Sequence, residues 1–189
     1  MDAVISAVPA TGSAPRSPRP PAAVPMAVMD QQNKEFVPYV LPVEVGTAVN
    51  FPNNDKIKHH VYSFSPAKKF ELPLYTTPPE PMLFDRPGVV ALGCNIHDWM
   101  VAYIVVVPTP YFTKSSAKGN WQIANVPAGD YDVQVWHPLL RSETGTVQRI
   151  AIGKTPATPV VFALDLKREV RRARPSDSTY GGERGSSSP

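Results

Sequence analysis

The chain has 189 residues, a formal net charge of +3 at pH 7, 42% hydrophobic residues and 23 prolines. A chain of this length can bury the core of one full-sized domain or of two small ones. The many prolines argue against long helices, the single cysteine excludes an internal disulfide, and no apolar run approaches the roughly 20 residues of a transmembrane helix.

The first 29 residues combine a short apolar segment with a proline-rich stretch. Residues 2–9, DAVISAVP, are typical of a short strand, and residues 13–29 are expected to form a linker because proline, alanine and serine dominate them. The segment has no basic region ahead of an apolar one, so it lacks the pattern of a secretory signal.

Residues 30–107 alternate short apolar runs with turns. The runs are rich in β-branched and aromatic residues and are bounded by proline and glycine, which predicts strands. The stretch 66–84 holds too many prolines for a regular helix. The strands expected here are residues 36–45, 47–53, 59–65, 87–94 and 100–107.

A second group of expected strands follows a junction at residues 108–113, and the sequence as a whole predicts an all-β chain. The basic run 167–175 has no aromatic-rich basic motif beside it, so we interpret it as a solvated tail and expect no nucleic-acid partner. Residues 174–189 hold almost no apolar side chains and are predicted to be disordered. The strands expected in this group are residues 119–138, 144–152 and 159–170.

The lone cysteine stands in GCNIHDWM, with a histidine three residues later and a methionine three residues after that. A thiolate, two imidazoles and a weakly held thioether form the ligand set of a blue-copper electron-transfer site. Cys94, His97 and Met100 offer three of these groups, and either His59 or His60 offers the fourth. Taken singly, each has a structural explanation, since a free cysteine is most often a small buried hydrophobe. Zinc also accepts cysteine and histidine ligands.

The spacing Cys-x2-His-x2-Met before an apolar strand, CNIHDWMVAYIVVV, resembles the ligand loop and last strand of cupredoxins of the plastocyanin and amicyanin type. FDRPGVVALGC resembles the turn and strand that deliver the cysteine, and VNFPNNDKIKHHV resembles the strand that carries the first histidine. The resemblance covers about residues 34–107 and implies a Greek-key β-sandwich over residues 30–107 that binds one copper ion.

The resemblance also implies roles for single residues. In the family motif the first histidine lies eight residues after the aromatic at Phe51 and four after Asp55, which favours His59 over His60. Asn54 is a candidate for hydrogen bonds between the ligand loops, although turn chemistry explains an asparagine there equally well. The implied ligands are His59, Cys94 and His97 in the equatorial plane and Met100 in the axial position, with an electron portal at His97 and Trp99.

GNWQIANVPAGDYDVQVWHP resembles the carboxypeptidase-regulatory-like, prealbumin-type β-sandwich modules. The alternation of Trp121 with Ile123 and of Tyr131 with Val133 fits a half-buried hairpin. We expect residues 1–12 and 109–168 to form this smaller sandwich together, with the cupredoxin inserted between them. His137 is expected to be structural.

The arrangement of a cupredoxin-like block followed by a second sandwich resembles that of bacterial plastocyanin-like proteins associated with methylamine utilisation. This resemblance implies a periplasmic one-electron carrier that cycles between Cu(II) and Cu(I), with a redox partner such as a c-type cytochrome or an amine dehydrogenase. No enzyme activity is expected, because a multicopper oxidase would need His-x-His pairs and the sequence has none. Two alternatives stay open: a copper-binding or delivery protein without electron transfer, and a β-sandwich scaffold with a vestigial metal site.

Overall fold

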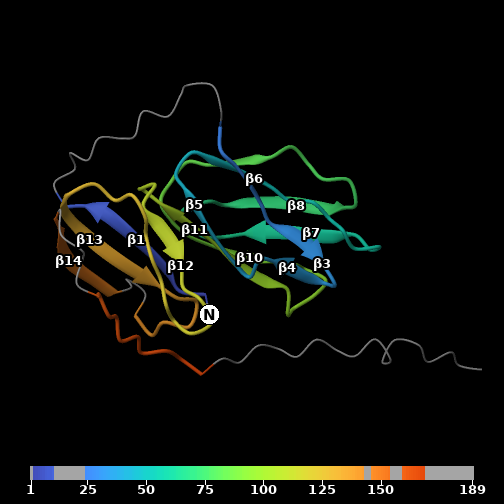
Figure 1. Ribbon diagram of the computed structural model, residues 1–189. Coiled ribbons are helices and arrows are strands. Elements are labelled where there is room, and N and C mark those ends of the chain that lie inside the picture. The colour runs from blue at the N-terminus through green and yellow to red at the C-terminus, as the bar shows by residue number, and fades with distance from the viewer. Residues whose placement is uncertain (1, 11–23, 143–145, 154–158, 169–189) are drawn as a thin grey trace, which may run out of the picture.

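The computed structural model describes residues 2–10, 24–142, 146–153 and 159–168 (Figure 1). The regular structure of these residues consists of strands, which confirms the predicted all-β class. No helix in these ranges is long and apolar enough to cross a membrane. The segment 13–29, predicted as a linker, is described only from residue 24, and its residues 26–28 form a strand. The tail predicted to be disordered, residues 174–189, lies outside the described residues.

One end of the molecule is a four-stranded antiparallel sheet with the strand order β12-β1-β13-β14 (Figure 1). Strand β1 pairs with β13 from Val4 opposite Trp136 to Pro9 opposite Tyr131. The chain therefore leaves this sheet after its first strand and returns to it only after β11. The strands are β1 (Val4–Pro9), β12 (Phe112–Lys114), β13 (Gly129–Trp136) and β14 (Thr146–Ile152).

The other end is built around a five-stranded sheet with the order β5-β11-β10-β7-β8. Strands β10 and β11 form its antiparallel centre, and β5 runs parallel to β11. The strands of this sheet are β5 (Val40–Glu44), β7 (His59–Ser63), β8 (Phe70–Tyr75), β10 (Gly88–Gly93) and β11 (Val101–Val107).

A three-stranded sheet and a hairpin complete this end of the molecule. The sheet has the order β2-β6-β9, and the hairpin joins β3 to β4 through two residues with positive φ, Asn33 and Lys34. Such a turn matches the twist of the paired strands. These strands are β2 (Met26–Val28), β3 (Asp30–Gln32), β4 (Glu35–Val37), β6 (Thr47–Asn50) and β9 (Met82–Phe84).

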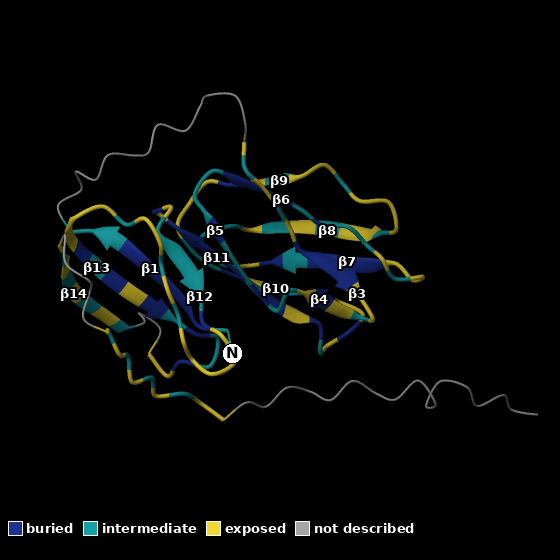
Figure 2. Cartoon of the chain, viewed as in Figure 1, coloured by how far each residue is buried: buried dark blue, intermediate teal, exposed yellow. Residues whose placement is uncertain are grey.

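The core of this end lies between the two sheets, and β7 is buried along almost its whole length (Figure 2). Phe51 and Phe84 are among its largest fully buried side chains. Cys94 and Met100 belong to the same apolar cluster. The sulfur-containing residues of the predicted ligand set therefore sit at the edge of a packed core, away from bulk water.

A smaller apolar cluster joins the two ends of the molecule. It contains Val4 of β1 and Val40 of β5, together with two valines of β11, and Trp136 packs against it. The Tyr103 and Trp136 rings lie 5.4 Å apart, and Lys114 Nζ donates to the Val40 carbonyl over 3.2 Å. Part of one face of the four-stranded sheet is therefore covered by the five-stranded sheet.

The strands differ from the sequence prediction in two places in the first block. The proline-rich stretch 66–84 contains β8 and β9, because β8 is an edge strand in which Pro73 has no second neighbour to bond. The single strand predicted over residues 36–45 is two strands, β4 and β5, separated at Pro38, which carries no backbone N–H.

Two further strands predicted at the other end are shorter or missing. Residues 119–128 are irregular with bends, Gly119 and Asn125 have positive φ, and the strand begins only at Gly129. Residues 159–168 have a single bridge, from Leu166 to Leu140. The stretch is apolar enough for a strand, but it lacks a continuous neighbour to pair with in the described part of the chain.

Candidate metal centre

Three of the predicted ligands converge at one end of the five-stranded sheet. His59 begins β7, Cys94 directly follows β10, and His97 lies in the turn between β10 and β11. Their candidate ligand atoms all lie within 4.8 Å of one another, and Cys94 Sγ is 3.7 Å from His97 Nδ1. All three side chains are buried, so the group faces the protein interior.

A glycine stands immediately before the cysteine, where a larger residue would displace a neighbouring side chain. A Cβ atom on Gly93 would lie 2.6 Å from the ring of Tyr62 on the neighbouring strand. This close approach sets β10 against β7 at the point where Cys94 leaves the sheet. The loop then closes with a hydrogen bond from the Met100 backbone N–H to the His97 carbonyl over 2.9 Å.

His59 has one ring nitrogen bonded and one without a partner. Its Nε2 donates to Asp55 Oδ2 over 2.7 Å, while Nδ1 is buried and makes no hydrogen bond of acceptable geometry among the described residues. A buried polar atom without a partner costs about 1–3 kcal/mol. In the neutral ring whose Nε2 donates to Asp55, the Nδ1 lone pair would be available to a metal ion beside the Cys94 sulfur.

Asp55 is itself held in place by the β3–β4 hairpin. Its carboxylate accepts the backbone N–H of Asn33 over 2.7 Å and that of Lys34 over 2.8 Å. Burial raises the pKa of Asp55, but these bonds together with His59 outweigh burial and lower the pKa below its ordinary value. The carboxylate is thus held ionised beside the imidazole that it orients.

The charges of the three ligand candidates influence one another. Burial lowers the pKa of His59, but Cys94 and Asp55 outweigh it and raise the pKa above its ordinary value. Burial likewise raises the pKa of the Cys94 thiol, yet His59 and the backbone N–H groups of His60 and Ile96 bring it below the ordinary value. The surroundings of Cys94 therefore favour the thiolate, the form that binds metal.

His97 differs from His59 in its titration. Burial, and after it the positive charges of His59 and Lys34, lower the pKa of His97. The imidazole is consequently kept neutral to lower pH than usual, as a metal ligand must be.

Met100 is 1% exposed and packs in the same cluster as Cys94. Its backbone N–H donates to the His97 carbonyl, which closes the loop between the two residues. Its role as an axial ligand stays a prediction.

His60, the alternative first histidine, lies outside the group of three. Successive residues of a strand point to opposite faces, and His60 accordingly bonds Glu71 Oε1 over 2.8 Å and packs on Tyr62. Asn54 donates to Asp30 Oδ2 over 2.7 Å. The hydrogen bonds of Asn54 therefore tie its loop to β3, not to the loop of Cys94.

Trp99 lies beside His97 with the two ring centroids 5.0 Å apart, and its Nε1 donates to the Lys34 carbonyl over 3.1 Å. His137 lies far along the chain, at the end of β13, where its Nδ1 accepts the Leu139 N–H over 3.1 Å. The sequence motif marks Asp55 only by its spacing from the histidine and assigns it no role. A carboxylate four residues before a candidate ligand histidine was the available signal.

Neither a protein-family model nor a curated protein matches the sequence. Solved structures do match parts of it. A mutant of amicyanin in its oxidized state is 22% identical, covering 46% of this chain and 87% of its own, with a TM-score of 0.40. A purple cupredoxin from Nitrosopumilus maritimus is 24% identical, covering 44% of this chain and 99% of its own, with a TM-score of 0.37.

A copper-containing nitrite reductase from Thermus scotoductus is 25% identical over 44% of this chain, with a TM-score of 0.40, but only 22% of the reductase chain is covered. The matches repeat the resemblance to cupredoxins seen in the sequence. With TM-scores this low they do not by themselves assign a function, which depends on the geometry of the site.

Proposed function

We propose that this protein is a type 1 copper protein that carries one electron at a time. The observation that carries the proposal is the buried group of His59, Cys94 and His97, whose ligand atoms lie within 4.8 Å of one another. The unpartnered Nδ1 of His59 fits a metal ion, because coordination would satisfy it.

Copper is the metal that best suits this donor set. Two imidazoles and a thiolate, with a weak and distant thioether, are the ligands of blue-copper centres, and we assign Met100 the axial position. Zinc would accept the histidines and the cysteine but would leave the thioether without a purpose. Bound copper would supply the Cu(II)/Cu(I) couple.

The protein's own residues would keep the ligand geometry fixed. Asp55 holds His59 through Nε2 and is in turn held by two backbone N–H groups of the β3–β4 hairpin. The cysteine and the methionine are embedded in the apolar core, which excludes water from the site. Ligands that do not move when the charge changes keep the reorganisation energy small.

We place the electron portal at His97 and Trp99, whose rings are in contact. Ile96 in the same loop is 50% exposed, so the surface there is partly apolar. Such a surface suits brief contact with a redox protein such as a c-type cytochrome or an amine dehydrogenase. We also propose that the protein works in the periplasm and takes part in bacterial methylamine utilisation. We propose that it carries electrons and is not itself an enzyme.

The domain boundaries are also a proposal. Residues 30–107 would be the cupredoxin, inserted into a smaller prealbumin-type sandwich of residues 1–12 and 109–168. Strand β1 precedes the proposed insertion and pairs with β12 and β13, which both follow it, and this pairing supports the proposed boundaries.

The test is to add Cu(II) to the purified protein and record the visible and EPR spectra. A type 1 centre gives an intense thiolate-to-copper band and a small hyperfine splitting, and both must disappear in Cys94→Ser. A colourless complex, or a spectrum indifferent to that substitution, contradicts the proposal and favours the vestigial-site alternative. Reversible voltammetry then separates a carrier from a copper-delivery protein.

A further inference from the structure

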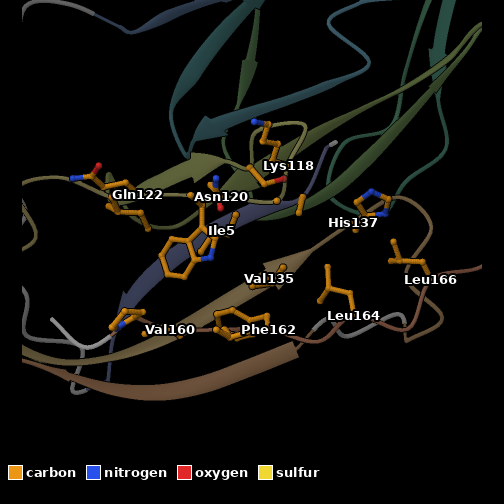
Figure 3. Close-up of a pocket in the computed structure, with 17 residues that line it drawn as sticks. Ile5, Lys118, Asn120, Gln122, Val135, His137, Val160, Phe162, Leu164 and Leu166 are labelled. Atoms are coloured by element: carbon orange, nitrogen blue, oxygen red, sulfur yellow. The ribbon is translucent and has the colours of Figure 1, made fainter.

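A cleft of about 780 Å³ opens on the four-stranded sheet (Figure 3). Its floor includes Ile5 of β1 and Val135 of β13, which are register partners. Because side chains alternate along a strand, this face is opposite to the one where Val4 and Trp136 meet the five-stranded sheet. The cleft is therefore separate from the candidate metal centre.

The cleft exists because non-strand segments cover this face incompletely. At one end of the face Tyr111 and Tyr131 pack edge to face, with ring centroids 6.1 Å apart, and fill the space. At the other end the lining includes the small side chains of Ala3 and Ser115. Residues 159–166 pass over the sheet without a continuous strand partner among the described residues. The volume that remains is in the range of small-molecule sites, roughly 300–1,000 Å³.

Apolar and aromatic groups form most of the wall. Trp121 and Phe162 come from the two covering segments, and their rings lie 6.2 Å apart. Along 160–166 the exposure alternates, so that Phe162 and Leu164 face the sheet while Val161 is 79% exposed. A flat apolar body fits between such groups.

The polar groups gather on one side of the cleft. Lys118, Asn120 and His137 lie along one side in Figure 3, and Phe162 and Leu164 lie along the other. The residues that line the cleft include lysine but no aspartate or glutamate in the described part of the chain. A cationic group at the edge of an apolar site favours a ligand with one negative end.

Lys118 is held over the cleft by a tight turn. Gly119 N–H donates to the Ser116 carbonyl over 2.9 Å, and Gly119 has a φ of 82°, which favours glycine. Lys114 and Arg149 in the same sheet pair with carboxylates, whereas Lys118 makes no ion pair with any described residue. Its charge is available to a ligand.

We propose that this cleft binds a small amphipathic monocarboxylate. The apolar body of the ligand lies against Trp121, Phe162 and Leu164, and its carboxylate pairs with the Lys118 ammonium at the rim. The binding is non-covalent and does not depend on a metal ion.

The experiment is calorimetric titration of the full chain with 4-phenylbutyrate, its uncharged amide and the corresponding primary amine. The acid is expected to bind with one-to-one stoichiometry and about 2- to 5-fold more tightly than the amide, as one partly exposed ion pair allows. Lys118→Gln should remove this preference and leave amide binding unchanged. Lys69→Gln, a lysine at a separate surface hollow, is the matched control and should change neither.

Amide chemical-shift changes locate the binding independently of any variant. They are expected at Trp121, Asn120 and Phe162, and changes confined to the other end of the molecule contradict the proposal. So does the absence of saturable binding at millimolar ligand, or an acid preference that survives Lys118→Gln. Repeating the titration on Cys94→Ser must give the same result, which separates this site from the proposed copper function.

Discussion

Replacing Asp55 with alanine tests the link between the β3–β4 hairpin and the candidate metal centre. The carboxylate is 14% exposed and accepts three hydrogen bonds, from His59 Nε2 and from the backbone N–H groups of Asn33 and Lys34. A hydrogen bond to a charged group contributes about 1.5–3 kcal/mol, and an exposed N–H such as that of Asn33 recovers most of its bond from water. We therefore expect the metal-free variant to lose about 2–3 kcal/mol of unfolding free energy.

The loss should depend on pH with a definite sign. The folded-state pKa of Asp55 lies below its unfolded value of about 3.9, so its contribution is present above that pH and is lost as the pH falls through the folded pKa. The pKa of His59 is raised, so its contribution is present below about 6.5 and is lost as the pH rises through the folded value. The difference between wild type and Asp55→Ala should be largest between about pH 4 and 6.5.

Urea unfolding of the metal-free proteins at several pH values measures this difference. Asp85→Ala is a matched control, because that carboxylate is exposed and lies 4.0 Å from its lysine partner, so it should change stability by less than about 0.5 kcal/mol. Nitrogen NMR of His59 adds a second measurement. In the wild type the neutral ring should carry its proton on Nε2, and in Asp55→Ala this preference should be lost. A loss equal to that of the control, or one independent of pH, refutes the reasoning.

Three further predictions concern Cys94 and the residues around it. Gly93→Ala should destabilise the fold by about 1–3 kcal/mol, since the new Cβ lies 2.6 Å from the Tyr62 ring, and Tyr62→Leu should relieve part of that loss in urea unfolding. Met100→Leu preserves volume and should cost less than about 1.5 kcal/mol in the metal-free protein, yet shift the potential of the copper-loaded one in voltammetry. In the metal-free protein His59→Ala should raise the pKa of Cys94, read from thiolate absorbance, and an unchanged pKa would show that His59 does not favour the thiolate.

The loop of Cys94, His97 and Met100 could be predicted because its spacing is local. Three potential ligands within seven residues can meet at one ion as soon as the segment turns, without help from distant parts of the chain. The strand character of the apolar runs could be predicted for the same reason, since β-branched residues and turn residues act over a few positions. The resemblance to cupredoxins that these motifs carried was found again among the solved structures.

The choice between His59 and His60 could be made from the family spacing but not from the local chemistry. Two adjacent residues of a strand face opposite sides, and only the neighbouring strands decide which side meets Cys94. The partner of each ring likewise depends on tertiary contacts: Asp55 for His59 and Glu71 for His60.

The contacts of Asp55 with the hairpin could not be predicted from the sequence, because they join residues 21 and 22 positions apart. The edge strand β8 was missed because proline counts against a strand unless the position is known to lie at an edge. The cleft could not be seen either, since it depends on where residues 159–166 run without pairing regularly.

The return of the chain to the four-stranded sheet has a consequence for the order of folding. The hydroxyl of Thr109 donates to the Ala7 carbonyl across 102 positions of sequence. Closing a flexible loop of about 100 residues costs about 1.4 kcal/mol more than closing one of about 20, a factor of about ten in rate. Folding of residues 25–107 first brings the ends of that block to neighbouring places, since the Ala48 N–H donates to the Pro25 carbonyl and the Val45 N–H donates to the Val107 carbonyl. This removes most of that cost. The four-stranded sheet should therefore form late, and a change that stabilises the candidate metal centre should also speed the closure of this sheet, which it does not contact.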